Sequence, residues 1–294
     1  MNSLVRDEAR AGTIEAGELT LRWAAVSDVG LVREANEDAA FVGPGLLLLA
    51  DGMGGHDCGE VASAAALNSL ADVDVDDLEK TRASVVDRLQ AAQNDIEGID
   101  TDSGRRAGTT VTGAVLVVEN GEPQWLVLNI GDSRTYRLLG GVLEQVTQDH
   151  SQVQELVDAG FITAEQARID PRRNVITRAL GAGMEPDADF FAVPVTPGER
   201  LLICSDGLTG EVEDNQISEL LSANDDPAEA AAALVAAALA GGGRDNITII
   251  IADVIGGEET TVDAVDEDAT TGGEPVAEAD QETAAATESA AEAE

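Results

Sequence analysis

Three apolar segments of strand length each have an aspartate at one end, and this repeated pattern most constrains the fold. The aspartates are Asp51 after residues 46–50, Asp206 after residues 201–205, and Asp245 before residues 247–251. Short apolar runs bounded by turn residues are typical of buried strands, and an aspartate at a strand end keeps its charge out of the core. Alone, Asp51-Gly52 is typical of an ordinary turn. If the three strand ends meet in space, however, their carboxylates form a cluster of oxygen ligands.

The composition limits the kinds of ligand and partner. The chain has 294 residues, a formal net charge of −40, two histidines and two cysteines. An acidic surface repels nucleic acid and anionic membranes, so we expect neither as a partner. Histidine and cysteine are too few for an ordinary zinc site, and carboxylates predict a hard cation such as Mn²⁺ or Mg²⁺. Two cysteines without a framework spacing, no signal peptide and no apolar stretch long enough to span a bilayer predict a cytoplasmic protein.

The chain divides by composition into three parts. We expect an N-terminal extension over residues 1–18, a folded domain over 19–255 and a disordered acidic tail over 256–294, because the tail has almost no large apolar residues. Within the domain, strands are predicted at 19–26, 109–118, 125–130, 135–139, 142–146, 190–193, 200–204 and 246–254. The four strands over 109–146 predict an antiparallel meander with a hairpin turn at Asn120-Gly121.

Helical patterns lie between these groups of strands. They cover residues 59–70, 76–96, 151–159, 163–167, 214–221 and 227–240. Ser151 is a plausible N-cap, and Thr163 with Gln166 has the spacing of a capping box. Residues 150–180 have little strand character, and we interpret them as a lid. Hairpins with helix pairs inserted between them favour an α+β fold of antiparallel sheets covered by helices.

Five aspartates next to turns or strand ends are candidate metal ligands: Asp38, Asp51, Asp132, Asp206 and Asp245. Without cations these carboxylates would repel one another, and some would stay protonated at pH 7. Two divalent ions resolve this conflict, because a metal pair about 3.5–4 Å apart clamps both oxygens of a phosphoryl transfer and activates a bridging water. We choose Asp51 as the bridging carboxylate, with the carbonyl of Gly52 beside it. Arg33 can hold the phosphate oxygens with its fork of donors.

Seven short motifs occur in order between about residues 19 and 254. They are Ser27-Asp28-Val29-Gly30, Arg33-x-x-Asn36-Glu37-Asp38, Asp51-Gly52-Met53-Gly54-Gly55-His56, Gly108-Thr109-Thr110, Gly131-Asp132-Ser133-Arg134, Ser205-Asp206-Gly207 and Asp245-Asn246-Ile247-Thr248. The set resembles the metal-dependent type 2C protein serine/threonine phosphatases (PPM family), short bacterial type. The resemblance implies an α-β-β-α sandwich, in which two antiparallel sheets lie face to face and helices flank both. It also implies a metal pair at one end, with residues 150–180 as a flap beside it.

The resemblance further implies a role for each matching position. Asp51 bridges two ions, Gly52 contributes its carbonyl, and Asp206 and Asp245 complete the direct ligands. Asp38, with Glu37, orients metal-bound waters. Asp132 matches the residue that holds a third, weaker ion, and Arg33 matches the phosphate-binding arginine.

Three positions depart from the family pattern. Met53 occupies the place where animal members have a histidine proposed as general acid. The nearest substitute, His56, is interpreted as a structural hydrogen-bonder, and a metal-bound water is our first choice of proton donor. In the flap, Ile169 falls near the place where some bacterial members have a polar contact to the third ion. Asp170 stands where a histidine often precedes the proline.

The leading hypothesis is a protein phosphatase of bacterial signalling that hydrolyses phosphoserine and phosphothreonine by attack of a metal-bridging water. We expect a monomer whose partners are phosphorylated proteins, namely Ser/Thr kinases and their substrates. The alternative is a non-catalytic regulator that keeps the fold and binds phosphoproteins. That alternative predicts lost metal ligands, whereas the main ones are present. A cation-binding acidic protein without chemistry would account for the tail but not for the ordered motifs.

Overall fold

The computed structural model describes residues 4–16, 19–54, 58–99, 106–181, 183 and 185–256. All of them belong to one compact unit, Met1–Gly257. The predicted acidic tail, apart from Gly256, lies outside the described residues. No helix in the described part of the chain combines the length and the hydropathy needed to cross a bilayer.

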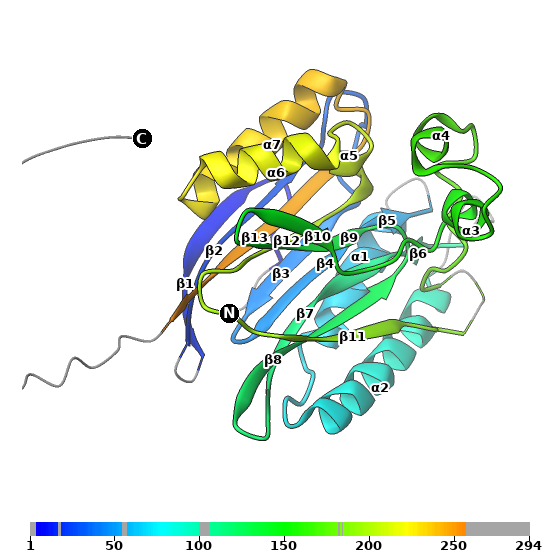
Figure 1. The fold of residues 1–294 in the computed structure, drawn as a ribbon. Coiled ribbons are helices and arrows are strands. Elements are labelled where there is room, and N and C mark those ends of the chain that lie inside the picture. The colour runs from blue at the N-terminus through cyan, green and yellow to red at the C-terminus, as the bar shows by residue number, and fades with distance from the viewer. Residues whose placement is uncertain are drawn as a thin grey trace, which may run out of the picture. The chain divides into compact units, whose positions relative to one another are not determined.

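Two antiparallel sheets form the centre of the unit (Figure 1). The strands are β1 (Ala9–Ala16), β2 (Leu19–Asp28), β3 (Ala39–Gly43), β4 (Leu46–Ala50), β5 (Gly52–Met53), β6 (Gly108–Thr109), β7 (Val111–Glu119), β8 (Glu122–Ile130), β9 (Arg134–Leu139), β10 (Val142–Gln145), β11 (Asp189–Pro194), β12 (Arg200–Cys204) and β13 (Ile247–Gly256). The six-stranded sheet has the order β1-β2-β13-β12-β9-β10, and the five-stranded sheet has the order β11-β8-β7-β4-β3. A short ribbon of β5 and β6 stands apart from both.

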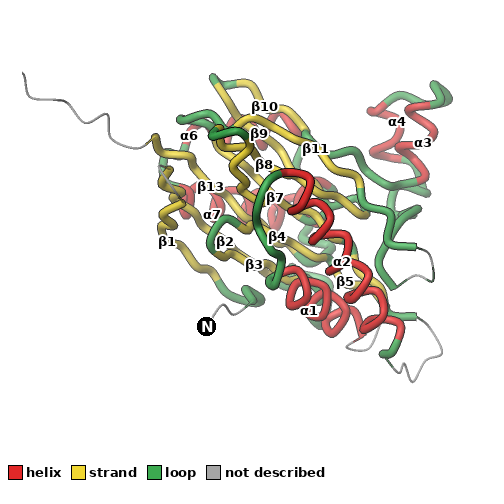
Figure 2. Tube along the Cα trace, turned by 90° about the horizontal axis from the view of Figure 1, so that it is seen from below, coloured by secondary structure: helices red, strands yellow, loops and turns green. Residues whose placement is uncertain are grey.

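Helices cover the outer face of each sheet. They are α1 (Cys58–Leu70), α2 (Leu78–Glu97), α3 (Gln152–Asp158), α4 (Ala164–Ile169), α5 (Asp206–Thr209), α6 (Asp214–Ala223) and α7 (Pro227–Gly241). α1 and α2 lie along the five-stranded sheet, α6 and α7 lie along the six-stranded sheet, and α3 and α4 project from one end (Figures 1 and 2). The projecting pair is the predicted flap. Its two predicted caps are confirmed, because Ser151 accepts from Gln154 N and Thr163 forms a capping box with Gln166.

Alternation along the strands produces three apolar cores. In β4, Leu46 and Leu48 join the core under α1 and α2, whereas Leu47 and Leu49 join the core between the sheets. In β13 the even and odd positions divide in the same way between the inter-sheet core and the core under α6 and α7. Successive side chains of a strand point to opposite faces, so a continuous apolar run is buried on both sides. The predicted sandwich of two helix-covered sheets is therefore confirmed.

The predicted meander over residues 109–146 is wrong. β7 and β8 pair in the five-stranded sheet, whereas β9 and β10 pair in the six-stranded sheet. The chain crosses between the sheets through Gly131–Ser133, where Gly131 has φ +109°. β11 and β12 likewise belong to different sheets, although only a short turn at Pro197-Gly198 separates them. Local turn signals identify the strands but do not show which sheet each strand joins.

The extension predicted over residues 1–18 does not stand apart from the domain in its described part. Residues 9–16 form β1, which pairs with β2 from Ala9 opposite Val26 to Ala16 opposite Leu19. Ile14 and Ala16 pack against the core between the sheets. The segment was missed because Ile14 is its single large apolar residue, which leaves the alternation of a strand almost without signal.

Candidate metal centre

The register of the strands brings the predicted ligands to one end of the sandwich. Ala39 pairs with Ala50 in antiparallel strands. Asp38, just before Ala39, and Asp51, just after Ala50, therefore lie at the same edge. Cys204 pairs with Ile249 in β13 and with Arg134 in β9. The aspartates at positions 206, 245 and 132 therefore leave neighbouring strands at the same end, from three separate segments of the chain.

Asp51 and Asp38 show the electrostatic consequence of this convergence. Desolvation raises the pKa of Asp51 well above its usual range, and the carboxylates of Asp38, Asp206, Asp132 and Asp245 raise it further. Desolvation also raises the pKa of Asp38 to about 7, although the hydroxyls of Ser205 and Thr248 partly offset this.

Asp206 and Asp132 belong to the same coupled group. Desolvation, reinforced by the charge of Asp245, raises the pKa of Asp206 to about 6. A hydrogen bond with the Asp51 side chain acts in the opposite direction. Desolvation raises the pKa of Asp132 well above its usual range, and Asp206 is the largest charge acting on it. The structure thus brings the other four predicted aspartates within electrostatic reach of Asp51.

Arg33 is the cation that faces this group. Its Nη2 donates to Asp245 Oδ2 at 2.6 Å, and its side chain is 49% exposed. Burial lowers the pKa of Arg33, but the charges of Asp245, Asp51 and Asp206 outweigh burial and raise it overall. The sequence predicted Arg33 as a phosphate ligand, and the structure places it as the partner of a predicted metal ligand. A half-exposed arginine can exchange that partner for a phosphate with little loss of packing.

Two glycines of the motifs permit close approaches of the backbone. A Cβ on Gly52 would stand 2.1 Å from the carbonyl oxygen of Gly59, and one on Gly207 would stand 1.9 Å from that of Asn246. Both distances are far below van der Waals contact. The glycine after Asp51 and the glycine after Asp206 are therefore required by packing between motifs, whatever else their carbonyls do.

Uncharged side chains hold the carboxylate-bearing segments together. Asn246 donates to the carbonyls of Val29 and Ala35 and accepts from Glu37 N, so it fixes the loop before Asp38. Thr110 Oγ1 accepts from Asp51 N at 3.1 Å and lies 2.9 Å from Ser133 Oγ. The Gly-Thr-Thr motif thereby links the segment of Asp51 to the segment of Asp132. The sequence identified these motifs but not the function of Asn246 and Thr110.

The donor set fits hard divalent cations. Asp38 Oδ2 is buried and has no hydrogen-bond partner among the described residues, so its lone pairs are available to a cation. The side chains of the group are carboxylates, the ligand type that Mg²⁺ and Mn²⁺ favour. As the side chains stand, no three or more His, Cys, Asp or Glu residues in the described ranges are arranged to hold an ion. Arg33 donates to Asp245, and the side chains of Asp51 and Asp206 share a hydrogen bond.

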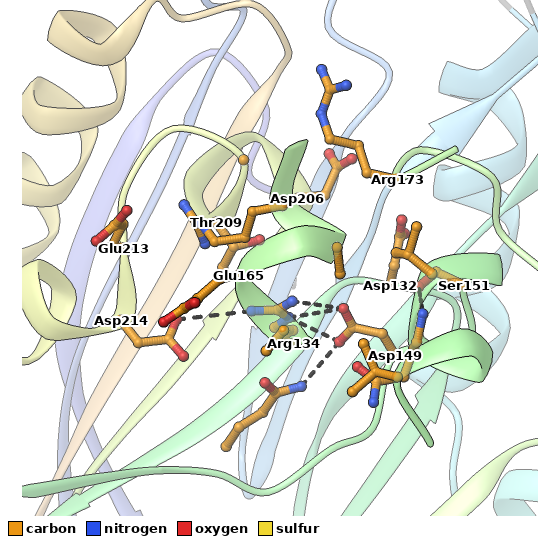
Figure 3. Close-up of a pocket in the computed structure, with 18 of the residues that line it drawn as sticks. Asp132, Arg134, Asp149, Ser151, Glu165, Arg173, Asp206, Thr209, Glu213 and Asp214 are labelled. Carbon is orange, nitrogen blue, oxygen red and sulfur yellow. Dashed lines mark hydrogen bonds and ion pairs between the residues drawn. The ribbon is translucent and has the colours of Figure 1, made fainter. Parts of the chain in front are cut away.

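A cavity of about 460 Å³ adjoins the carboxylates (Figure 3). Asp132 and Asp206 line its inner wall, the flap helices α3 and α4 line one side, and α5 with the start of α6 lines the other. Arg134 and Asp149 of the lining belong to a partly buried network that was not predicted from the sequence. In that network Arg134 Nη2 donates to Asp149 Oδ2 at 2.7 Å, and Arg134 Nη1 donates to the hydroxyl of Tyr136.

The structure describes all three residues that depart from the family pattern, Met53, Ile169 and Asp170. Met53 is half-buried and pairs with Gly108, and its thioether has no proton to donate. His56 lies outside the described residues. Ile169 is 83% exposed at the end of α4, and Asp170 is bound by Arg172 through Oδ1 and Oδ2, both at 2.8 Å. Arg172 therefore already occupies the carboxylate that stands in the place of the flap histidine.

Fold and site together define a helix-covered β-sandwich with a carboxylate centre at one end, and the chain belongs to the protein phosphatase 2C family. The family model matches residues 33–239. The chain is 40% identical over 248 residues to the serine/threonine protein phosphatase PstP of Mycobacterium tuberculosis, covering 81% of this chain. The match spans 46% of that relative, so the chain corresponds to about half of its length.

Solved structures show the same architecture. The crystal structure of the M. tuberculosis phosphatase PstP/Ppp superposes with a TM-score of 0.72 at 42% identity, covering 80% of this chain and 99% of that one. A structure of the catalytic domain of PstP in complex with two manganese ions superposes with a TM-score of 0.68 at 42% identity, covering 81% of this chain and 99% of that one. The manganese pair is an observation on that protein.

Proposed function

We propose that this protein hydrolyses phosphoserine and phosphothreonine in proteins with the help of two Mn²⁺ or Mg²⁺ ions. One observation carries the proposal: five aspartates from five separate segments converge beside Arg33, in a chain of the protein phosphatase 2C family. Desolvation raises the pKa values of four of these carboxyl groups. A convergence so unfavourable to ionisation is retained where bound cations offset it.

Each residue of the group has a task in this proposal. Asp51 would bridge the two ions because its carboxyl interacts with all four other aspartates. Asp206 and Asp245, with the carbonyl of Gly52, would complete the direct ligands. Bound there, the two metal ions would activate a water and hold the phosphate oxygens for in-line displacement. Arg33 would release Asp245 and bind the non-reacting phosphate oxygens with its fork of donors.

Two further carboxylates would act beside the two metal ions. Asp38, with its unpartnered oxygen, would orient the waters around the ions, while Ser205 and Thr248 hold its carboxylate in place. Asp132 would contribute to a third, weaker ion on the side of the cavity, next to Asp206. The cavity under the flap would receive the polypeptide that carries the phosphate.

The partners follow from this chemistry. We propose phosphorylated Ser/Thr kinases and their substrates as partners, in bacterial signalling in the cytoplasm, with the protein acting as a monomer. The non-catalytic alternative requires that the ligand set be broken. Instead, all the predicted ligands are present and brought together at one end of the sandwich, and no contact in the described structure favours the alternative.

The test is hydrolysis of a phosphothreonine peptide with Mn²⁺ present and after EDTA. We expect turnover that needs Mn²⁺ and that Asp51→Asn abolishes. The matched control is Asp72→Asn, because Asp72 is exposed and follows the far end of α1, about 20 Å along the helix from its first turn. Turnover in metal-free buffer, or equal rates for Asp51→Asn and the control, would overturn the proposal.

A further inference from the structure

His150 connects the loop that carries Asp132 with both ends of the flap. Only 6% of its surface is exposed. Its backbone N donates to Gly131 O at 2.9 Å, and its ring Nδ1 accepts from Gly131 N at 3.1 Å. His150 thus binds both polar backbone groups of the residue just before Asp132, and Asn129 Nδ2 donates to the same carbonyl at 3.1 Å.

The second ring nitrogen contacts a different segment. Because Gly131 N is a donor, Nδ1 must carry a lone pair, and the ring proton is on Nε2. Nε2 donates to Asp189 Oδ2 at 3.0 Å, at the first residue of β11. Arg178 Nη1 lies 3.4 Å from Nε2, but its shorter bond, 2.9 Å, is to Asp189 Oδ1. The orientation of the ring is therefore determined from both sides.

The flap begins and ends at the same point. His150 O accepts from Thr177 N at 2.7 Å, and Ser151 forms a bridge with Ile176. The flap helices have little packing of their own, since Val153 is the one buried residue of α3 and α4 has none. Segments with few buried contacts open at low cost, so the position of the flap depends strongly on this base.

The preceding residue completes a clamp around Asp132. Asp149 binds Arg134 through two carboxylate oxygens, while His150 binds Gly131. Positions 131 and 134 are thus both held by consecutive residues, and the loop between them carries Asp132 into the cavity. Neither Asp149 nor His150 stands in a motif that predicts a role from the sequence.

We propose that His150 is a positioning residue for Asp132, acting through the bond from Gly131 N to Nδ1. It sets where the Asp132 carboxylate stands relative to Asp206, and it makes that placement depend on the base of the flap. The inference rests on the proposed function, because it assigns Asp132 to a bound divalent cation. Packing alone would not require an acceptor at Nδ1.

Two substitutions of His150 distinguish the roles of its two ring nitrogens. In His150→Asn the side-chain oxygen can take the place of Nδ1 and accept from Gly131 N, whereas its reach is too short for Asp189. In His150→Gln the longer amide can donate to Asp189 in place of Nε2, but Gly131 N loses its acceptor. The proposal therefore predicts different effects of two amides that differ by one methylene.

The readout is Mn²⁺ binding to the full chain by titration calorimetry without substrate, with thermal unfolding as the stability control. Asp132→Asn should remove one Mn²⁺ site. We expect His150→Gln to raise the Kd of that same site about 5- to 10-fold, the effect of one lost buried hydrogen bond. We expect His150→Asn to stay within about 2-fold of wild type. In the Asp132→Asn background, His150→Gln should have no further effect, since residues that act as one unit are not additive.

Several results would overturn the inference. They are equal Mn²⁺ binding by both His150 variants, an effect of His150→Gln that persists in the Asp132→Asn background, and no effect of Asp132→Asn itself.

If His150→Gln does not fold, Asp189→Asn decides, because it leaves the bond to Gly131 in place and should preserve Mn²⁺ binding. A loss of binding in Asp189→Asn overturns the assignment to Nδ1. Absence of phosphopeptide hydrolysis by the wild type overturns the proposed function instead, which keeps the two failures distinct.

Discussion

Substitution of Asp38 by asparagine should stabilise the metal-free protein at neutral and alkaline pH. The Asp38 pKa is about 7 in the folded protein, against 3.8 for a free side chain, chiefly because of desolvation. One pKa unit corresponds to about 1.4 kcal/mol. Ionising this carboxyl in the fold therefore costs about 4 kcal/mol of unfolding free energy at pH 8.

The sign follows from proton binding. Between pH 4 and 7 the folded state holds a proton on Asp38 that the unfolded state has released, so the unfolding free energy of the wild type falls as pH rises through this window. Asparagine carries no charge at any of these values. Its oxygen can still face Ser205 and Thr248, and its amide replaces an oxygen that has no partner among the described residues.

The assay is urea unfolding in EDTA at pH 4.5 and pH 8, with Asp72→Asn as the exposed control. Asp38→Asn should equal the wild type within about 1 kcal/mol at pH 4.5 and exceed it by about 4 kcal/mol at pH 8. Saturating Mn²⁺ should shrink the difference, because the ion stabilises the charged carboxylate of the wild type. Equal stabilities at pH 8, or a gain that does not change with pH, would refute the electrostatic reasoning.

Three further predictions concern the same end of the sandwich. Mn²⁺ should raise the melting temperature of the wild type more at pH 8 than at pH 5, because carboxyl groups with raised pKa values must lose protons to bind it; equal shifts in thermal scans would contradict this. Gly207→Ala should cost about 2 kcal/mol or more in urea unfolding, since its Cβ would collide with Asn246 O, whereas Gly98→Ala at the end of α2 should stay within about 1 kcal/mol. Arg33→Ala should lower kcat/KM for a phosphopeptide about 100-fold, while its half-exposed pair with Asp245 makes the loss of stability under about 1 kcal/mol; a large stability loss would assign Arg33 to structure.

Much of the site could be predicted because aspartates at strand ends leave a local trace in the sequence. Asp51 follows β4 and Asp206 follows β12, and each is marked by an apolar run that stops at a turn. The clamp at Asp149 and His150 leaves no such trace. Both residues precede a short helix with no strand pattern, and their partners, Arg134 and Gly131, are brought to them by the crossing between sheets.

The errors in the predicted fold have the same origin, namely contacts that leave no local trace in the sequence. Periodicity identified β8 and β9, but it carries no information about which partner strand each will find. The crossing at Gly131–Ser133 is set by the two facing cores, which are properties of the whole chain. β1 was missed because pairing with β2, rather than its own apolar content, keeps it in the sheet. The Arg33–Asp245 pair likewise joins residues 212 positions apart, and spacing along the chain does not predict it.

Counting Mn²⁺ ions bound to the wild type and to Asp51→Asn tests the central claim most directly. Because both full-length chains carry the same acidic residues after Gly256, the difference between their calorimetric isotherms isolates binding by the carboxylate centre. We expect about two tightly bound ions in the wild type and the loss of both in Asp51→Asn, since a bridging ligand serves both ions. Tight binding that survives Asp51→Asn unchanged would contradict the assignment of Asp51 as the bridge.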